Sequence, residues 1–212
     1  MKINKPLDGN HVFLMSDLHY GHENILRLSK RPFMSIDDMN SWIVKHLQED
    51  TTKDDIIFDL GDMFWKADPE KVKKIIESVP AKIYKVMGNH DPIKYYEGGG
   101  ILENSFIDVV DFVEILVNLK GAAYQATLCH FPMLSWPNKS RGAFMIHGHC
   151  HGNSDPTNSA STDLRVDVGV DGIIAKKKGS PLVKFEEVVE YFKEKTGGMP
   201  FKEWVQQVGQ NL

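Results

Sequence analysis

The chain has 212 residues, of which 42% are hydrophobic and 10% aromatic, and this composition predicts one globular domain over residues 1–212. Its net charge of −4 provides no general basic surface for binding nucleic acid or an anionic membrane. No export signal precedes the first elements, and no uncharged apolar run approaches about 18 residues. With only Cys129 and Cys150, too few for a disulfide framework, we expect a soluble protein of the reducing cytoplasm.

The first half of the chain alternates short apolar runs with amphipathic segments. The runs at 11–17, 54–62 and 82–91 predict strands, and helices are predicted over 35–50 and 68–79. Ser35 with Asp38 three residues later resembles a capping box, and Asp68 before Pro69 is typical of a helix start. This alternation of strand and helix predicts a mainly parallel, buried sheet.

The second half is richer in β-forming residues. Residues 106–130 contain two such runs joined at Lys120-Gly121, which predicts a hairpin. Further strands are predicted at 142–148, 164–171 and 180–185, with helices at 185–195 and 200–210. We therefore expect a more antiparallel second sheet packed on the first, with helices outside. In the last helix, one apolar face (Phe201, Trp204, Val205, Val208) is expected to cover a sheet.

Five apolar runs end in side chains that bind metal ions in proteins. These ends are Asp17 with His19, Asp62, Asn89 to Asp91, His130, and His149 with His151. Because the carboxyl ends of neighbouring strands converge on one edge in layered α/β proteins, we expect all five to build one site. The members of each spaced pair are two residues apart, so in extended backbone they would project to the same side. A glycine precedes three of the candidates (Gly61, Gly88, Gly148), where a missing Cβ permits close backbone approach.

The chemistry of this set points to two metal ions. It combines two carboxylates, one amide and four imidazoles: Asp17, His19, Asp62, Asn89, His130, His149 and His151. Structural zinc sites favour cysteine-rich tetrahedral sets, whereas magnesium and calcium favour nearly all-oxygen sets. Seven ligands are too many for one tetrahedral ion, but they fit two ions that share a carboxylate and keep open positions. We expect two divalent ions, Mn²⁺ first, with Fe, Zn, Mg, Ni or Co as alternatives.

Each residue also has a simpler interpretation. A lone Asp or His at a strand end is more often a cap, a turn residue or a satisfied polar group, and only the joint occurrence at five ends favours a site. His147 lies inside a predicted strand, which favours packing or support of a ligand. Cys150 would point away from its neighbours by strand alternation, so a catalytic thiol is not expected.

The ordered blocks "DLH", "GD", "GNHD", "CHFPM" and "GHCH" closely resemble the motifs of the calcineurin-like metallophosphoesterase superfamily, and they span about two thirds of the chain. The longer runs "SDLHYGHENI", "KRPF" and "HFPMLSW" resemble small bacterial and phage phosphoesterases without accessory domains. The resemblance implies an α/β fold, a four-layer α/β/β/α sandwich of two mixed β-sheets flanked by helices.

Residue roles follow from the same resemblance. It implies that one metal is held by Asp17, His19 and His151, the other by Asn89, His130 and His149, and that Asp62 bridges them. His90 would be the catalytic histidine beside the phosphate, with Asp91 as its orienting partner. Candidate substrate contacts are His22, Arg31 and Arg141, each of which has surface exposure as its alternative.

The expected activity is phosphoester hydrolysis, in which a hydroxide bridging the metals attacks in line and His90 assists the leaving group. The small size and mildly acidic charge of the chain disfavour a processive nuclease that grips many phosphates, so a small substrate is expected. A phosphodiester or nucleotide-type ester is favoured over a monoester. A phosphomonoesterase, or an inert metal-binding interaction module, is the alternative. Nucleic acid stays open as a substrate, although no basic binding surface is evident, and the oligomeric state is not indicated.

Overall fold

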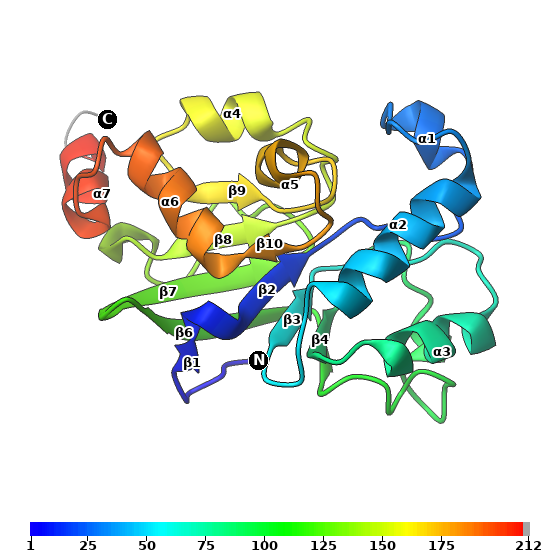
Figure 1. Ribbon diagram of the computed structural model, residues 1–212. Helices are drawn as coiled ribbons and strands as arrows, with labels where there is room; N and C mark the ends of the chain where they lie inside the picture. The colour runs from blue at the N-terminus through cyan, green and yellow to red at the C-terminus, as the bar shows by residue number, and fades with distance from the viewer. Residues whose placement is uncertain (210–212) are drawn as a thin grey trace.

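The computed structural model describes residues 1–209 and contains two five-stranded β-sheets. The first sheet has the strand order β10 (Val183–Lys184), β2 (Val12–Met15), β3 (Ile56–Asp59), β4 (Lys82–Val86) and β5 (Val109–Val110). The second has the order β1 (Leu7–Asp8), β6 (Phe112–Leu119), β7 (Ala122–Cys129), β8 (Phe144–His147) and β9 (Arg165–Asp167). Both sheets mix parallel and antiparallel pairs and are flanked by helices (Figure 1), so the predicted α/β fold class is confirmed.

The first half of the chain forms the predicted βαβαβ unit. Strands β2, β3 and β4 are parallel, and α2 (Ile36–Glu49) and α3 (Pro69–Ser78) form the crossovers between them. Both helices bury one apolar face against the outer side of this sheet. Ser35 caps α2, since its Oγ accepts from the Asp38 N–H at 3.1 Å, and Asp68 caps α3 through the N–H of Glu70 at 3.0 Å.

The second sheet is less antiparallel than its hairpin suggests. β6 and β7 form the predicted hairpin, with positive φ at Lys120 and Gly121, 50° and 80°. However, β8 and β9 continue parallel to β7, and the last strand, β10, pairs antiparallel with β2 in the first sheet. The second sheet was expected to be the more antiparallel of the two, but in the described residues each sheet has one antiparallel and three parallel strand pairs, because long connections return the chain to run parallel.

The main core lies between the two sheets and extends under the C-terminal helices. The inner faces of both sheets share one apolar cluster with α6 (Phe185–Lys195) and α7 (Phe201–Gly209). Phe144 of β8 is its centre, with ring centroids of Phe192 and Phe201 at 4.6 and 5.0 Å. The predicted apolar face of the last helix thus packs on a sheet; Gln210 lies outside the described residues.

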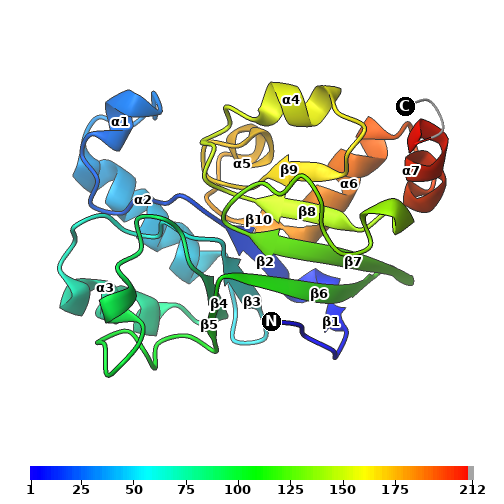
Figure 2. The ribbon, with the colours of Figure 1, turned by 180° about the vertical axis from the view of Figure 1, so that it is seen from behind.

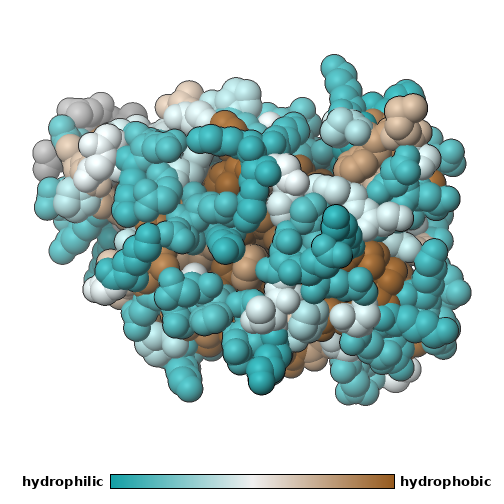
Figure 3. All heavy atoms as spheres, viewed as in Figure 1, coloured by the Kyte–Doolittle hydropathy of each residue, from teal (hydrophilic) through white to brown (hydrophobic). Residues whose placement is uncertain are grey.

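The remaining helical segments are short: α1 (Ile25–Leu28), α4 (Asp155–Ala160), α5 (Ile173–Lys178), η1 (Gly9–His11), η2 (Ile93–Tyr95) and η3 (Lys139–Arg141). Figures 1 and 2 show α1 to α3 on one flank of the molecule and α4 to α7 on the other. The face in Figure 3 is mostly hydrophilic, with small, separate apolar patches. Within residues 1–209, no helix is long and apolar enough to span a bilayer.

Replacing Ser35 by alanine is expected to lower the free energy of unfolding by about 1 kcal/mol, because the N–H of Asp38 loses its side-chain acceptor. Urea denaturation monitored by circular dichroism measures this difference. Ser41→Ala on the exposed middle of the same helix is the control and should be neutral or stabilising by up to about 0.5 kcal/mol. Equal effects of the two substitutions would contradict a capping role.

Candidate metal centre

The candidate site lies where strands of both sheets end. Asp17, Asp62 and Asn89 follow β2, β3 and β4, while His130 and His149 follow β7 and β8. Backbone hydrogen bonds join the loops after these strands. The Asp17 N–H donates to Gly61 at 2.9 Å, the Gly148 N–H to His130 at 3.0 Å, and the Val170 N–H to Ser16 at 3.1 Å. The last bond links the two sheets, so the loops form one continuous edge.

Several candidate ligands have left-handed backbone conformations. Among the described residues, nine non-glycine residues have positive φ, and five of them are candidate ligands: Asp17 (56°), His19 (50°), Asp62 (56°), His149 (68°) and His151 (49°). The expectation that the spaced pairs project together from extended backbone was therefore wrong. Left-handed turns bring them together instead, and such strained residues concentrate at functional sites.

Two glycines permit the loops to touch. A Cβ on Gly148 would overlap the hydroxyl of Ser16 and the carboxylate of Asp17, and a Cβ on Gly88 would overlap the Asp62 carboxylate. The predicted close approach is thus present at both positions. Any side chain there would push the β4 and β8 loops away from the two carboxylates.

The first group of ligand atoms comes from Asp17, His19 and His151, all within 4.8 Å of one another. His151 Nε2 lies 3.8 Å from Asp17 Oδ1. Within residues 1–209, Asp17 Oδ1 and His19 Nε2 are buried and have no hydrogen-bond partner. Buried polar atoms in proteins almost always have a hydrogen-bond partner. Two unpaired atoms that belong to one group within 4.8 Å are therefore consistent with a site for a cation.

The second group is centred on Asn89. Its Oδ1 lies 2.9 Å from His130 Nε2 and 2.9 Å from His149 Nδ1. Asp62 Oδ2 is 3.6 Å from His130 Nε2 and 3.8 Å from His19 Nε2 of the first group. One oxygen of the Asp62 carboxylate therefore lies within 4 Å of an imidazole nitrogen from each group.

Burial favours the neutral form of two candidate ligand imidazoles, His19 and His130, and of the Asp17 carboxyl group. Burial lowers the pKa of His19 to about 2 and also lowers that of His130. Burial, together with the charge of Asp167, raises the pKa of Asp17 to about 7. Burial opposes protonation of His151, but its hydrogen bond with Asp171 and the negative charges of Asp17 and Asp171 together outweigh burial and raise the pKa. A cation at this point would favour the charged carboxylate and the neutral imidazoles.

His90 stands beside the centre without joining either group. Its backbone N–H donates to Asp62 Oδ1 at 2.8 Å, and its exposed ring lies 5.7 Å from the His19 ring. The ring packs edge-on against Trp65, with centroids 4.6 Å apart. His22 stacks on the same indole at 4.6 Å, and its Nδ1 is 3.4 Å from His19 Nδ1. His22 and Trp65 thus form an aromatic wall beside His90.

A family model for calcineurin-like phosphoesterase matches residues 11–175. The chain belongs to this family. A metal-dependent phosphoesterase is therefore supported jointly by the family and by the candidate metal-binding residues Asp17, His19, Asp62, His130 and His151.

The chain is similar to one curated protein in sequence and to one solved structure in fold. It is 29% identical over 143 residues to the uncharacterized protein MJ1445 of Methanocaldococcus jannaschii, covering 67% of this chain and 70% of the relative. A crystal structure of the protein of unknown function AQ665 from Aquifex aeolicus superposes with a TM-score of 0.63 at 22% identity. That match covers 85% of this chain and 98% of the other, and it shows a shared fold.

Asp91 does not orient His90 as expected. Its Oδ2 accepts from the backbone N–H groups of Gly88 and Asp62 at 2.8 and 2.9 Å, and it lies 2.7 Å from Lys85 Nζ. The other oxygen, Oδ1, accepts from the Tyr96 hydroxyl at 3.3 Å, so both carboxylate oxygens are bonded to groups other than the His90 ring. Asp91 therefore supports the loops after β3 and β4 and does not hydrogen-bond the His90 side chain in the described residues.

Arg31 is buried and is not placed to contact a substrate. Its guanidinium donates to Asp171 at 2.7 Å and to the carbonyls of Asp17 and Leu18 at 2.6 and 2.8 Å. Asp171 in turn lies 2.8 Å from His151 Nδ1. Arg31 thus holds the carboxylate that orients a candidate ligand, so its assignment as a phosphate contact is corrected.

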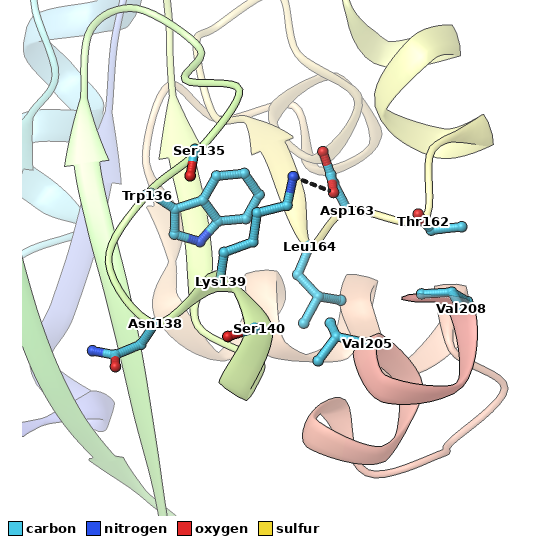
Figure 4. Close-up of a pocket in the computed structure, with 10 residues that line it drawn as sticks. All are labelled: Ser135, Trp136, Asn138, Lys139, Ser140, Thr162, Asp163, Leu164, Val205 and Val208. Carbon is cyan, nitrogen blue, oxygen red and sulfur yellow. Dashed lines mark ion pairs between the residues drawn. The ribbon is translucent and has the colours of Figure 1, made fainter. Parts of the chain in front are cut away.

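Arg141 lies at the opposite end of β8 from His149. It is exposed in η3, which packs against α7. A cleft of about 410 Å³ between these segments (Figure 4) is lined by Trp136, Lys139, Asp163 and Val205 among others, and by none of the candidate ligands. The hypothesis that Arg141 contacts the phosphate is therefore not supported by its position.

The other residues of the "HGHCHG" segment have structural roles. His147 is fully buried; its Nδ1 is 2.8 Å from the Gly148 carbonyl and its Nε2 is 3.1 Å from the Asn158 amide. Both ring nitrogens are therefore occupied, in keeping with packing. Burial raises the pKa of the Cys150 thiol, which disfavours a nucleophilic thiolate.

Asp171, which bonds the candidate ligand His151, is one of two residues near the centre that the strand-end pattern had not singled out. It follows β9 at the end of an apolar run, where the strand-end argument would have found it. It is the last residue of the strand predicted at 164–171, and no other role was predicted for it. Asp167, fully buried near Asp17, was missed in the same way.

The affinity of the metal-free protein for Mn²⁺ is expected to rise from about pH 5.5 to about pH 7.5, by up to about tenfold per pH unit for each proton displaced. Asp17, with a pKa of about 7, and His151, with a raised pKa, must both lose a proton to bind a cation. Isothermal titration calorimetry across this range measures the slope. His11→Ala is the control, since His11 also has a raised pKa but lies before β2, and a flat profile in the wild type would contradict the assignment.

Proposed function

We propose that this phosphoesterase hydrolyses phosphodiester or nucleotide-type phosphoesters with two divalent metal ions, Mn²⁺ first, in the cytoplasm. The observation that carries the proposal is the Asp62 carboxylate, whose Oδ2 lies 3.8 Å from His19 Nε2 and 3.6 Å from His130 Nε2. A carboxylate in this position can serve both ligand groups. The mixed nitrogen and oxygen donors suit manganese as well as iron or zinc, and the two free cysteines favour a reducing compartment.

In this proposal the ligand sets are Asp17, His19 and His151 for one ion, and Asn89, His130 and His149 for the other, with Asp62 between them. When bound, two divalent ions acidify water and neutralise the phosphoryl oxygens. His90 donates a proton to the leaving alkoxide or stabilises its developing charge. Trp65 and His22 limit the positions that the His90 ring can adopt.

The positions of the two candidate arginines favour a diester. A monoesterase usually pairs extra positive side chains with the terminal phosphate oxygens. Arg31 is committed to Asp171 and two carbonyls, and Arg141 lies at the other end of β8. Neither is placed to recognise a second negative charge, so the small phosphoester substrate is proposed to be a diester or a nucleotide-type ester.

Hydrolysis assays with Mn²⁺ test the substrate class. The expected order of kcat/KM is bis-p-nitrophenyl phosphate or a cyclic nucleotide above p-nitrophenyl phosphate, because only the monoester needs extra cations. Faster turnover of the monoester would favour the phosphatase alternative, and hydrolysis of single-stranded DNA would extend the substrate to nucleic acid. No activity on any of these, with metal bound, would favour an inert interaction module.

His90→Ala is expected to lower kcat by about 10²- to 10⁴-fold while metal content stays unchanged, because His90 belongs to neither ligand group. Its loss should also cost more for an alkyl ester than for a p-nitrophenyl ester, whose leaving group needs little protonation. Metal analysis by mass spectrometry and the two rate ratios measure both effects.

The matched control for this substitution is His46→Ala. His46 lies on α2 and bonds only Asp50, at 2.6 Å, so its loss should leave kcat unchanged. If His90→Ala instead removed metal in proportion to activity, His90 would be a ligand and its catalytic role would be wrong.

A further inference from the structure

A fully buried lysine lies beneath the candidate metal centre. Lys85 of β4 is paired in register with Asp59 of β3, and its Nζ lies 2.7 Å from Asp59 Oδ2 and 2.7 Å from Asp91 Oδ2. Lys85 and Asp59 are each 0% exposed. The pKa of Lys85 is raised despite burial, because both carboxylates stabilise its charge. The two sheet loops that follow β3 and β4 are thus joined by an ionic network.

Stability alone is a poor explanation for this network. Removing an ammonium and two carboxylates from water is costly, and replacing such groups by apolar residues is often neutral or stabilising. The same network does provide specific geometry, since one Lys85 ammonium fixes two carboxylates that are 32 residues apart in the chain.

Each carboxylate passes this restraint to a ligand-bearing loop. Asp91 Oδ2 accepts from the backbone N–H groups of Asp62 and Gly88 at 2.9 and 2.8 Å. Asp59 Oδ1 accepts from the N–H of Gly61 at 3.1 Å. These donors belong to the residues that carry or directly precede the candidate ligands Asp62 and Asn89. Asp62 has a φ of 56°, a conformation that persists only where its surroundings enforce it.

We propose that Lys85 is a positioning residue of the metal centre, which holds the loops of Asp62 and Asn89 through Asp59 and Asp91. The inference rests on the proposed metal-dependent function. Lys85 contacts neither substrate nor metal in this scheme. It sets the affinity for the metal pair, as groups that orient ligands typically do.

The test is the double substitution Lys85→Met with Asp59→Asn, which removes one positive and one negative charge and keeps Asp91 as an acceptor. Calorimetric titration of the metal-free protein with Mn²⁺ should show about 10- to 100-fold weaker binding. The Mn²⁺ concentration for half-maximal hydrolysis should rise in parallel, whereas kcat at saturating Mn²⁺ should change far less. Lys82→Met, an exposed lysine on the same strand, is the matched control and should bind Mn²⁺ like the wild type.

Asp59→Asn alone provides the test if the double variant does not fold, since it weakens one ion pair and keeps an oxygen for the N–H of Gly61; its Mn²⁺ affinity should fall several-fold. Unchanged Mn²⁺ affinity in a folded variant would overturn the role of Lys85 while leaving the proposed function intact. A wild type that binds no Mn²⁺ would overturn both. A loss confined to kcat at saturating Mn²⁺ would also contradict a role in metal binding.

Discussion

The carboxylate of Asp62 is the point at which the separate loops of this protein become one site. One oxygen accepts the N–H of His90 at 2.8 Å, while the other lies between His19 and His130. Its backbone N–H donates to Asp91 at 2.9 Å, and its carbonyl accepts from the N–H of His19 at 3.0 Å. A displacement of this residue would therefore move both ligand groups and the candidate catalytic histidine together.

The site holds its ligands in unfavourable backbone conformations. A left-handed non-glycine residue costs about 1–3 kcal/mol, and five candidate ligands, Asp62 among them, adopt positive φ. These conformations persist because the surroundings fix them: strand ends on one side, and hydrogen bonds between loops on the other. Gly88 and Gly148 also help to fix these conformations, because their missing Cβ atoms leave room for the carboxylates of Asp62 and Asp17.

The sequence predicted the position of the site better than its internal geometry. Strand ends carry Asp17, Asp62 and Asn89 to one edge because β2, β3 and β4 are parallel strands of one sheet and end on the same side. His130 reaches this edge from β7 of the other sheet. The left-handed backbone conformations of the candidate ligands depend on contacts between loops, so no pattern in the neighbouring sequence predicts them. The role of Arg31 was mistaken for a similar reason: its partner Asp171 is 140 residues away, and only the fold brings the two together.

Each ligand group is backed by a buried cation that faces away from solvent. Arg31 bonds Asp171, which orients His151, and Lys85 bonds Asp91, which holds the backbone of Asp62. Both side chains form ion pairs with buried carboxylates, so neither is placed to bind a phosphate group. Under the proposed function, attraction of an anionic substrate would therefore have to come from the bound metal ions and from exposed cations such as Lys66, whose Nζ lies 5.5 Å from the Trp65 ring. If the proposed function holds, phosphate recognition would depend strongly on metal occupancy, because the two buried cations, Arg31 and Lys85, bind carboxylates that support the ligands rather than the substrate.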